Sequence, residues 1–140
     1  MIVIRNIVHD ETFLNQKAEV ATNTKEDHDI AQDLLDTLDF YHKECVGLAA
    51  NMIGENKAII AIDNNGFLEI MFNPVITSKS EPYETEEGCL SLKGTRKCQR
   101  YKHIEVSYHD QQFITQNRRF SDFTAEIIQH EIDHLMGILI

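Results

Sequence analysis

The feature that most constrains this 140-residue chain is the segment His130-Glu131-Ile132-Asp133-His134 near its carboxyl end. Two histidines four residues apart share one face of a helix, about 5 to 6 Å apart, so both imidazoles can reach one metal ion. Glu131 projects beside that position, where it can accept a proton from water held there. In a chain with seven histidines the spacing can also arise by chance, so the motif needs support from its surroundings.

The residues around the motif predict a helix from Phe123 to Met136, with Gly137 as its C-terminal cap. Apolar residues recur along it at helical spacing and form one face. They are Ala125, Ile127, Ile128, Ile132, Leu135 and Met136. The motif therefore falls in the second half of an independently predicted amphipathic helix.

A catalytic metal of this type takes three protein ligands and leaves one position open. Only six residues follow His134, and Ile140 stands where a metzincin has its third histidine. We therefore expect the third ligand upstream, and Cys89 in the segment Glu87-Gly88-Cys89-Leu90-Ser91 is the candidate. A metal ion deprotonates a coordinating thiol, so the chemistry is sound. The alternative is that Cys89 is only a small buried side chain.

A second helix is predicted from Lys25 to Lys43, where Thr24 and Asp27 form a capping box at its start. Residues 1 to 24 are otherwise expected to be irregular, with a short helix near 10 to 16. The segment Val46 to Ala50 is too short for a helix. Its small residues indicate a place where two backbones approach closely.

Strands are predicted at 58 to 62 and 67 to 73, joined by the turn Asn64-Asn65-Gly66. Pro74 should end or bend the second strand, and residues 77 to 87 are expected to be a polar loop. Alternating apolar and polar residues from 104 to 109 predict a further strand, and residues 110 to 112 a turn. The predicted fold class is α+β, with antiparallel β-sheets packed around the C-terminal helix in a single domain over residues 1–140.

Composition narrows the function classes. The net charge of -10 argues against binding to nucleic acid or to an anionic membrane surface. No stretch approaches the roughly 20 apolar residues of a membrane span. Three cysteines cannot all pair, so we expect a cytoplasmic protein with reduced thiols.

Three segments together resemble the signature motifs of peptide deformylases. They are Gly47-Leu48-Ala49-Ala50, the Cys89 segment, and Gln129 to Leu135, in the family's order and approximate spacing. Phe72-Asn73-Pro74 and Arg100 extend the likeness over almost the whole chain. The resemblance implies a peptide deformylase-like fold and an enzyme that removes the formyl group from the N-terminal methionine of new bacterial proteins. N-formylmethionyl peptides would be its partners, with the ribosome as a further one.

The resemblance also implies a metal centre and its chemistry. Cys89, His130 and His134 would bind one divalent ion, natively Fe(II), which zinc, nickel or cobalt can replace. Glu131 would act first as general base and then as acid toward the departing amine. The backbone N–H of Leu90 would help to polarise the formyl oxygen.

The same resemblance implies where the substrate lies. The peptide would extend beside Gly47 as an added strand. Glu87 and Arg100 would position the substrate or the ligands. The pocket for the methionine side chain would be lined by Val46, Phe123 and Ile127.

Two positions depart from the family's first motif. Cys45 replaces a glycine, and Met52 replaces the glutamine whose amide donates a hydrogen bond to the oxyanion. A thioether has no proton to donate, and loss of one such donor costs about 10²- to 10³-fold in turnover. Asn51 carries an amide, but on an extended segment it would point to the opposite face.

Two hypotheses follow. One is a working deformylase with reduced activity. The other is a catalytically impaired relative that binds metal and peptide without useful turnover, and a different amide hydrolase that uses the same site is also open.

Overall fold

The computed structural model describes residues 2–139, so Ile140, the position compared with a metzincin histidine, lies outside the described part. The described residues form one five-stranded sheet, three α-helices and a 3-10 helix. In chain order they are α1 (Glu11–Leu14), α2 (Lys25–Phe40), β1 (Gly47–Ala49), η1 (Ala50–Ile53), β2 (Ile59–Asn64), β3 (Phe67–Cys89), β4 (Leu92–His109), β5 (Thr115–Ser121) and α3 (Asp122–Leu135). Each strand pairs antiparallel with the next, which confirms the predicted α+β class.

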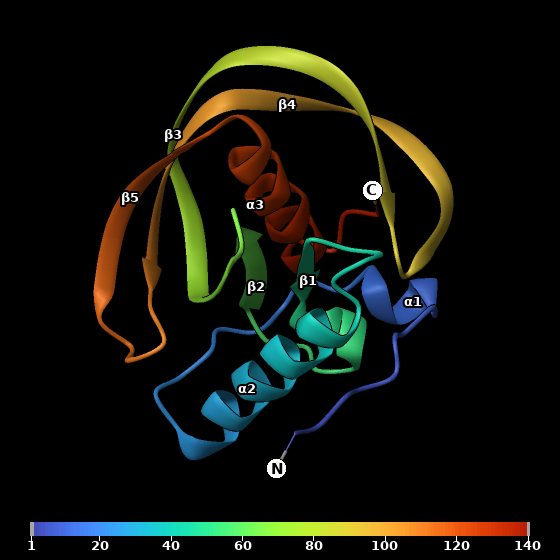
Figure 1. Ribbon diagram of the computed structural model, residues 1–140, viewed down its shortest axis with the longest axis vertical. Coiled ribbons are helices and arrows are strands. Elements are labelled where there is room, and N and C mark those ends of the chain that lie inside the picture. Colours follow the sequence, from blue (N-terminus) through green and yellow to red (C-terminus); the bar gives the residue numbers. More distant parts are fainter. Residues whose placement is uncertain (1, 140) are drawn as a thin grey trace.

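The two longest strands, β3 and β4, pair to form a ribbon that arches over α3 (Figure 1). The prediction of a polar loop at residues 77–87 is wrong, because these residues pair with β4 from Ser78↔Glu105 to Glu87↔Arg96. The side chains from Thr77 to Pro82 are exposed on both faces of the ribbon. A strand that covers no core carries no apolar alternation, so the hydrophobic pattern missed it.

The turn between β2 and β3 was predicted correctly. Asn65 and Gly66 both have positive φ, 52° and 97°, as the mirror-image turns of two-residue hairpins require. Pro74 bends β3 rather than ending it, because it lies in an irregular register between Phe72 and Val75. Asn73 at this bend bonds both backbone groups of Ala21 through its side-chain amide, at 2.8 and 2.9 Å.

Helix α2 begins as predicted, with the Thr24 side chain accepting from the Asp27 backbone N–H. The reciprocal half of the expected capping box is absent, because Asp27 accepts from the backbone N–H and hydroxyl of Thr22 instead. The helix ends at Phe40, and hydrogen-bonded turns follow before Cys45. The short helix expected near 10 to 16 is α1.

Helix α3 lies beneath the arch, between the ribbon and the strands β1 and β2 (Figure 1). Its predicted bounds agree to within one residue, and Gly137 follows it with φ of +77°. Strand β5, which leads into α3, was not predicted. Because α3 is covered on several sides, polar residues of its motif are buried, including His134 at 0% exposure.

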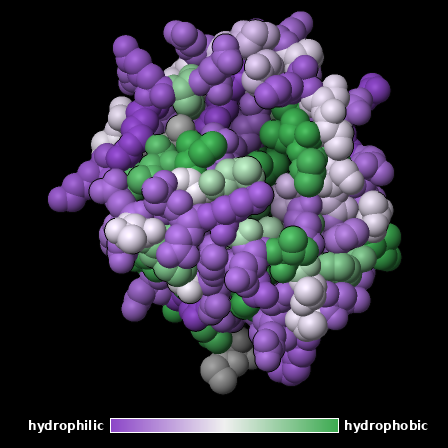
Figure 2. Space-filling model, turned by 180° about the vertical axis from the view of Figure 1, so that it is seen from behind, coloured by the Kyte–Doolittle hydropathy of each residue, from purple (hydrophilic) through white to green (hydrophobic). Residues whose placement is uncertain are grey.

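No helix among residues 2–139 combines the length and the apolar character needed to span a membrane. On the face shown in Figure 2, hydrophobic side chains form separate patches on a largely hydrophilic surface.

Candidate active site

Three ligand-type atoms from two elements meet beneath the arch. His130 and His134 lie one turn apart on α3, with their Nε2 atoms 3.2 Å apart. Cys89 ends β3, where an irregular register follows Gly88, and its Sγ lies 3.3 Å from His134 Nε2. The three donor atoms all lie within 4.8 Å of one another. Strand β3, whose second half sequence patterning missed, therefore brings Cys89 to the helix.

A buried chain of charged groups orients His130. Its Nδ1–H donates to Glu87 Oε1 at 2.8 Å, which directs Nε2 to the other ligand atoms. Arg100 donates to both carboxylate oxygens of Glu87, at 2.9 and 2.7 Å, and to Asp133 at 2.6 Å. Burial opposes the charge on Glu87, but the hydrogen bonds from His130 and Arg100 hold its pKa well below the usual range.

The two histidines differ in their protonation. Burial lowers the pKa of His134 to about 3, so its ring is neutral near pH 7. Burial also opposes a charge on His130, but hydrogen bonds to Cys89 and Glu87 outweigh it and raise its pKa to about 10. A metal ion binds there only by displacing the proton from His130.

Glu131 is the one carboxylate of the motif that lacks a partner. Its side chain is 4% exposed, and its Oε1 is buried without a hydrogen bond within the described residues. Burial raises the pKa of this carboxyl to about 7. A Cβ on Gly47 would lie 2.9 Å from Glu131 Oε2 and 2.9 Å from Ile127 Cγ2. The atoms that this Cβ would meet belong to side chains of α3, so Gly47 leaves room for side chains and not for the second backbone that the sequence predicted.

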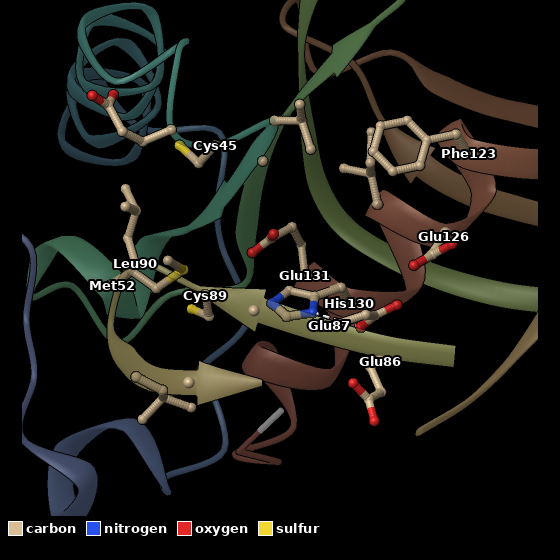
Figure 3. A pocket seen from close by; sticks show the side chains of 17 residues that line it. Cys45, Met52, Glu86, Glu87, Cys89, Leu90, Phe123, Glu126, His130 and Glu131 are labelled. Atoms are coloured by element: carbon tan, nitrogen blue, oxygen red, sulfur yellow. Dashed lines mark hydrogen bonds and ion pairs between the residues drawn. The ribbon is translucent and has the colours of Figure 1, made fainter. Parts of the chain in front are cut away.

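A pocket of about 570 Å³ opens beside these groups (Figure 3). Val46, Gly47, Met52, Glu87, Leu90, Phe123 and Ile127 line it together with Cys89, His130 and Glu131. Arg100 does not line the pocket and lies behind Glu87. Cys45, Gly88 and Glu126 also line the pocket. Sequence reasoning missed four further lining residues, Glu44, Glu86, Leu92 and Gly94.

Met52 lies in η1 at 1% exposure, and its Sδ accepts the Ala49 backbone N–H at 3.4 Å. The assumption that this segment is extended is wrong, because Asn51 and Met52 belong to a 3-10 helix. Asn51 nonetheless cannot replace a pocket amide, since its Nδ2–H donates to the His134 carbonyl at 2.9 Å. Neither residue offers a side-chain donor to the pocket.

Other contacts at the site had little or no signal in the sequence. The Tyr83 hydroxyl donates to Glu126 at 3.0 Å, and His9 Nδ1 lies 3.1 Å from the Ser91 carbonyl. Asp133 is an exception. It lies one turn beyond Gln129 on α3, and the Gln129 side chain bonds the backbone of Tyr101 on β4. Helical spacing therefore places Asp133 on the same side of the helix, toward β4. Tyr83 lay in the segment expected to be a loop.

The donor set fits a catalytic metal ion. One thiolate and two imidazoles are ligands that divalent transition metals accept, and three protein ligands leave a position open. The unpartnered Glu131 oxygen lies in the same pocket, where it can receive a proton. Fold and site together define a metal-dependent hydrolase.

The comparisons with known proteins give the family. The model of the family described as polypeptide deformylase matches residues 4–140. A peptide deformylase from Clostridium beijerinckii is 51% identical over 138 residues, covering 99% of this chain and 100% of that protein. The chain belongs to the polypeptide deformylase family, whose members are hydrolases with a single divalent metal ion.

Solved structures agree with this assignment. A peptide deformylase from Legionella pneumophila superimposes with a TM-score of 0.89 at 31% identity, covering 98% of this chain and 83% of that one. A class I type b peptide deformylase from Acinetobacter baumannii, solved with Met-Ala-Ser bound, gives a TM-score of 0.86 at 28% identity. That match covers 99% of this chain and 97% of the other.

Proposed function

We propose that this protein removes the N-formyl group from the initiator methionine of nascent peptides. The observation that carries the proposal is the unpartnered, buried Glu131 carboxylate, which lines one pocket with the ligand-type atoms of Cys89 and His130. The Acinetobacter baumannii relative solved with Met-Ala-Ser supports a peptide of this type as the product. A cytoplasmic location and contact with the ribosome remain predictions that follow from this substrate.

Cys89 Sγ, His130 Nε2 and His134 Nε2 are the proposed ligands, with Fe(II) as the native ion and zinc, nickel or cobalt as replacements. Such an ion lowers the pKa of a water molecule and polarises a carbonyl oxygen. Glu87 holds His130 in the tautomer that presents Nε2, and Arg100 holds Glu87. Both residues position a ligand; Arg100 lies outside the pocket, whereas Glu87 also lines it.

Glu131 accepts the proton from the attacking water and returns it to the amine that leaves as the C–N bond breaks. A pKa raised by burial to about 7 suits a group that must do both near neutral pH. The backbone N–H of Leu90, in the turn beside Cys89, is the proposed donor to the formyl oxygen. Deformylation then yields formate and a free N-terminal amine.

Strand β1 is an edge of the sheet, because within residues 2–139 it pairs with β2 alone. An extended peptide can add to that edge beside Gly47, which has no side chain of its own. Val46, Phe123 and Ile127 line the pocket at this edge and supply apolar surface for the methionine side chain. Phe123 is 60% exposed and gains burial when that side chain enters.

The alternative is a catalytically impaired protein that binds metal and peptide. Met52 favours this alternative, because its sulfur accepts a hydrogen bond from the Ala49 backbone N–H and has no proton to donate to the substrate.

The deciding experiment measures turnover of formyl-Met-Ala-Ser by protein loaded anaerobically with Fe(II). The Glu131→Gln variant is the matched control, since it keeps the side-chain volume and removes the base. The proposal predicts turnover by the parent protein, and no turnover by the variant at equal metal content. A parent protein that carries metal and turns over no peptide supports the alternative.

A further inference from the structure

The turn between β3 and β4 carries two groups whose placement matters for the proposed chemistry. Cys89 ends β3 and holds a proposed ligand atom, and Leu90 follows it with the backbone N–H proposed for the formyl oxygen. Met52 lines the same pocket, but its sulfur only accepts a hydrogen bond and supplies no donor (Figure 3). The orientation of this turn therefore decides how well the pocket stabilises negative charge on that oxygen.

The turn has a backbone that does not favour a tight hairpin. Cys89 and Leu92 are register partners, so Leu90 and Ser91 form a two-residue connection. The favoured two-residue hairpin turns need a positive φ at the first residue or at both. Within residues 2–139, neither Leu90 nor Ser91 is among the residues of positive φ. A contact from outside the hairpin is therefore needed to fix this turn in one orientation.

The side chain of His9 supplies that contact. Its Nδ1 lies 3.1 Å from the Ser91 carbonyl oxygen, and because a carbonyl only accepts, Nδ1–H is the donor. The Ser91 backbone N–H turns back to Cys89 Sγ at 3.4 Å, and the Ser91 hydroxyl is buried without a hydrogen-bond partner in the described chain. Among the hydrogen bonds of the described residues, only the one from His9 joins Leu90 or Ser91 to an element other than the hairpin.

The backbone on both sides of His9 is held in place, although the His9 side chain is exposed. Val8, the residue before it, donates its backbone N–H to the Met52 carbonyl of η1 at 2.8 Å. Asp10, the residue after it, caps α1 by accepting the Thr12 backbone N–H at 3.0 Å. Figure 1 shows α1 beside the turn that joins β3 to β4. The segment from Val8 to Asp10 therefore links η1 to this turn.

We propose that His9 is a positioning residue, whose hydrogen bond to Ser91 fixes the turn so that the Leu90 N–H is directed at the formyl oxygen. The proposal deepens the proposed function and rests on it for the identity of the substrate. His9 does not line the pocket, so it acts through the turn. Because the bond fixes the direction of a donor and forms no part of the apolar pocket, its loss affects turnover more than peptide binding.

Two substitutions of His9 test the hydrogen bond. His9→Leu removes the donor at an exposed position and leaves the core closed. His9→Asn keeps a donor, because asparagine Nδ2 stands as many bonds from the backbone as histidine Nδ1. His42→Leu is the matched control. His42 is also exposed, and its Nδ1 also bonds a backbone carbonyl, that of Asp39 at 2.8 Å, but this bond lies at the end of α2 and does not reach the β3–β4 turn.

The first measurement is turnover of formyl-Met-Ala-Ser at matched metal content. We expect kcat of His9→Leu to fall about fivefold with KM within about twofold of the parent, since a hydrogen bond of about 1 kcal/mol corresponds to that factor. His9→Asn should recover most of the loss, and His42→Leu should behave as the parent protein. A parent-like kcat in His9→Leu, or an equal loss in His9→Asn or His42→Leu, overturns the proposal.

The second measurement reports on the turn without catalysis. In zinc-loaded protein isotope-labelled at the leucine nitrogens, the magnetic-resonance signal of the Leu90 amide should shift in His9→Leu, and its proton should exchange faster. Both should return toward the parent values in His9→Asn. If the parent protein does not deformylate the peptide, the proposed function fails, and this signal alone decides whether His9 holds the turn. An unchanged Leu90 signal in His9→Leu overturns the proposal in an active or an inactive protein.

Discussion

Replacing Met52 by glutamine should raise turnover of formyl-Met-Ala-Ser by about 10²-fold or more. Met52 is 1% exposed and lines the same pocket as Leu90, while its sulfur accepts the Ala49 backbone N–H at 3.4 Å. Glutamine has nearly the same length, so its amide oxygen can accept that N–H. Its NH₂ group then becomes available to the formyl oxygen. One oriented donor to an oxyanion is worth about 10²- to 10³-fold in kcat, or about 2.7–4 kcal/mol.

The assay is kcat at saturating peptide with metal content matched between proteins. Met52→Leu is the control, because it removes the sulfur and supplies no donor, and its kcat should stay within about threefold of the parent. A gain below about threefold in Met52→Gln, in a protein that folds and holds its metal, would refute the argument that the pocket lacks a side-chain donor.

Three further outcomes are expected. Glu87→Gln should weaken metal binding about 10- to 100-fold in a chelator competition, because a neutral amide is a weaker acceptor for His130 Nδ1–H and leaves Arg100 partly unpaired; unchanged affinity would contradict the positioning role. Gly47→Ala should lower kcat and cost about 1–3 kcal/mol in chemical denaturation, because the new Cβ meets Glu131 Oε2 at 2.9 Å. Leu34→Ala, at 0% exposure in α2, should cost about 3 kcal/mol of unfolding free energy with little change in kcat per folded molecule, and a loss below about 1 kcal/mol would mean that α2 is loosely packed.

The sequence predicted best where local chemistry and packing agree. Helix α3 has an apolar face, a glycine after its end and a ligand spacing that only a helix makes useful, and its bounds were correct to one residue. The Asn64–Gly66 turn was equally clear, because Asn65 and Gly66 tolerate positive φ at low cost.

Prediction failed where backbone pairing, and not side-chain burial, fixes the structure. Residues 77–87 are a strand because β4 supplies their hydrogen-bond partners over a long, exposed ribbon. The position of Asn51 likewise depends on a distant partner, the carbonyl of His134, 83 residues away. Pairing with β4 and a contact over that sequence distance do not depend on the spacing of apolar residues, so the local hydrophobic pattern does not reveal them.

The exposed ribbon and the buried site depend on each other. Arg100 lies on β4, Glu87 on β3 and His130 on α3, so one chain of hydrogen bonds joins all three elements. The bidentate pair runs diagonally across the ribbon, from Arg100, the register partner of Tyr83, to Glu87, which lies two residues before Cys89. An isolated two-stranded ribbon is marginally stable in water, so the contacts with α3 hold the ribbon as much as the ribbon holds the helix. Strand β3 has little apolar pattern of its own, and the buried hydrogen bonds of Arg100, Glu87 and His130 fix its position against α3. A substitution of Arg100 or Glu87 should therefore displace Cys89 as well as His130.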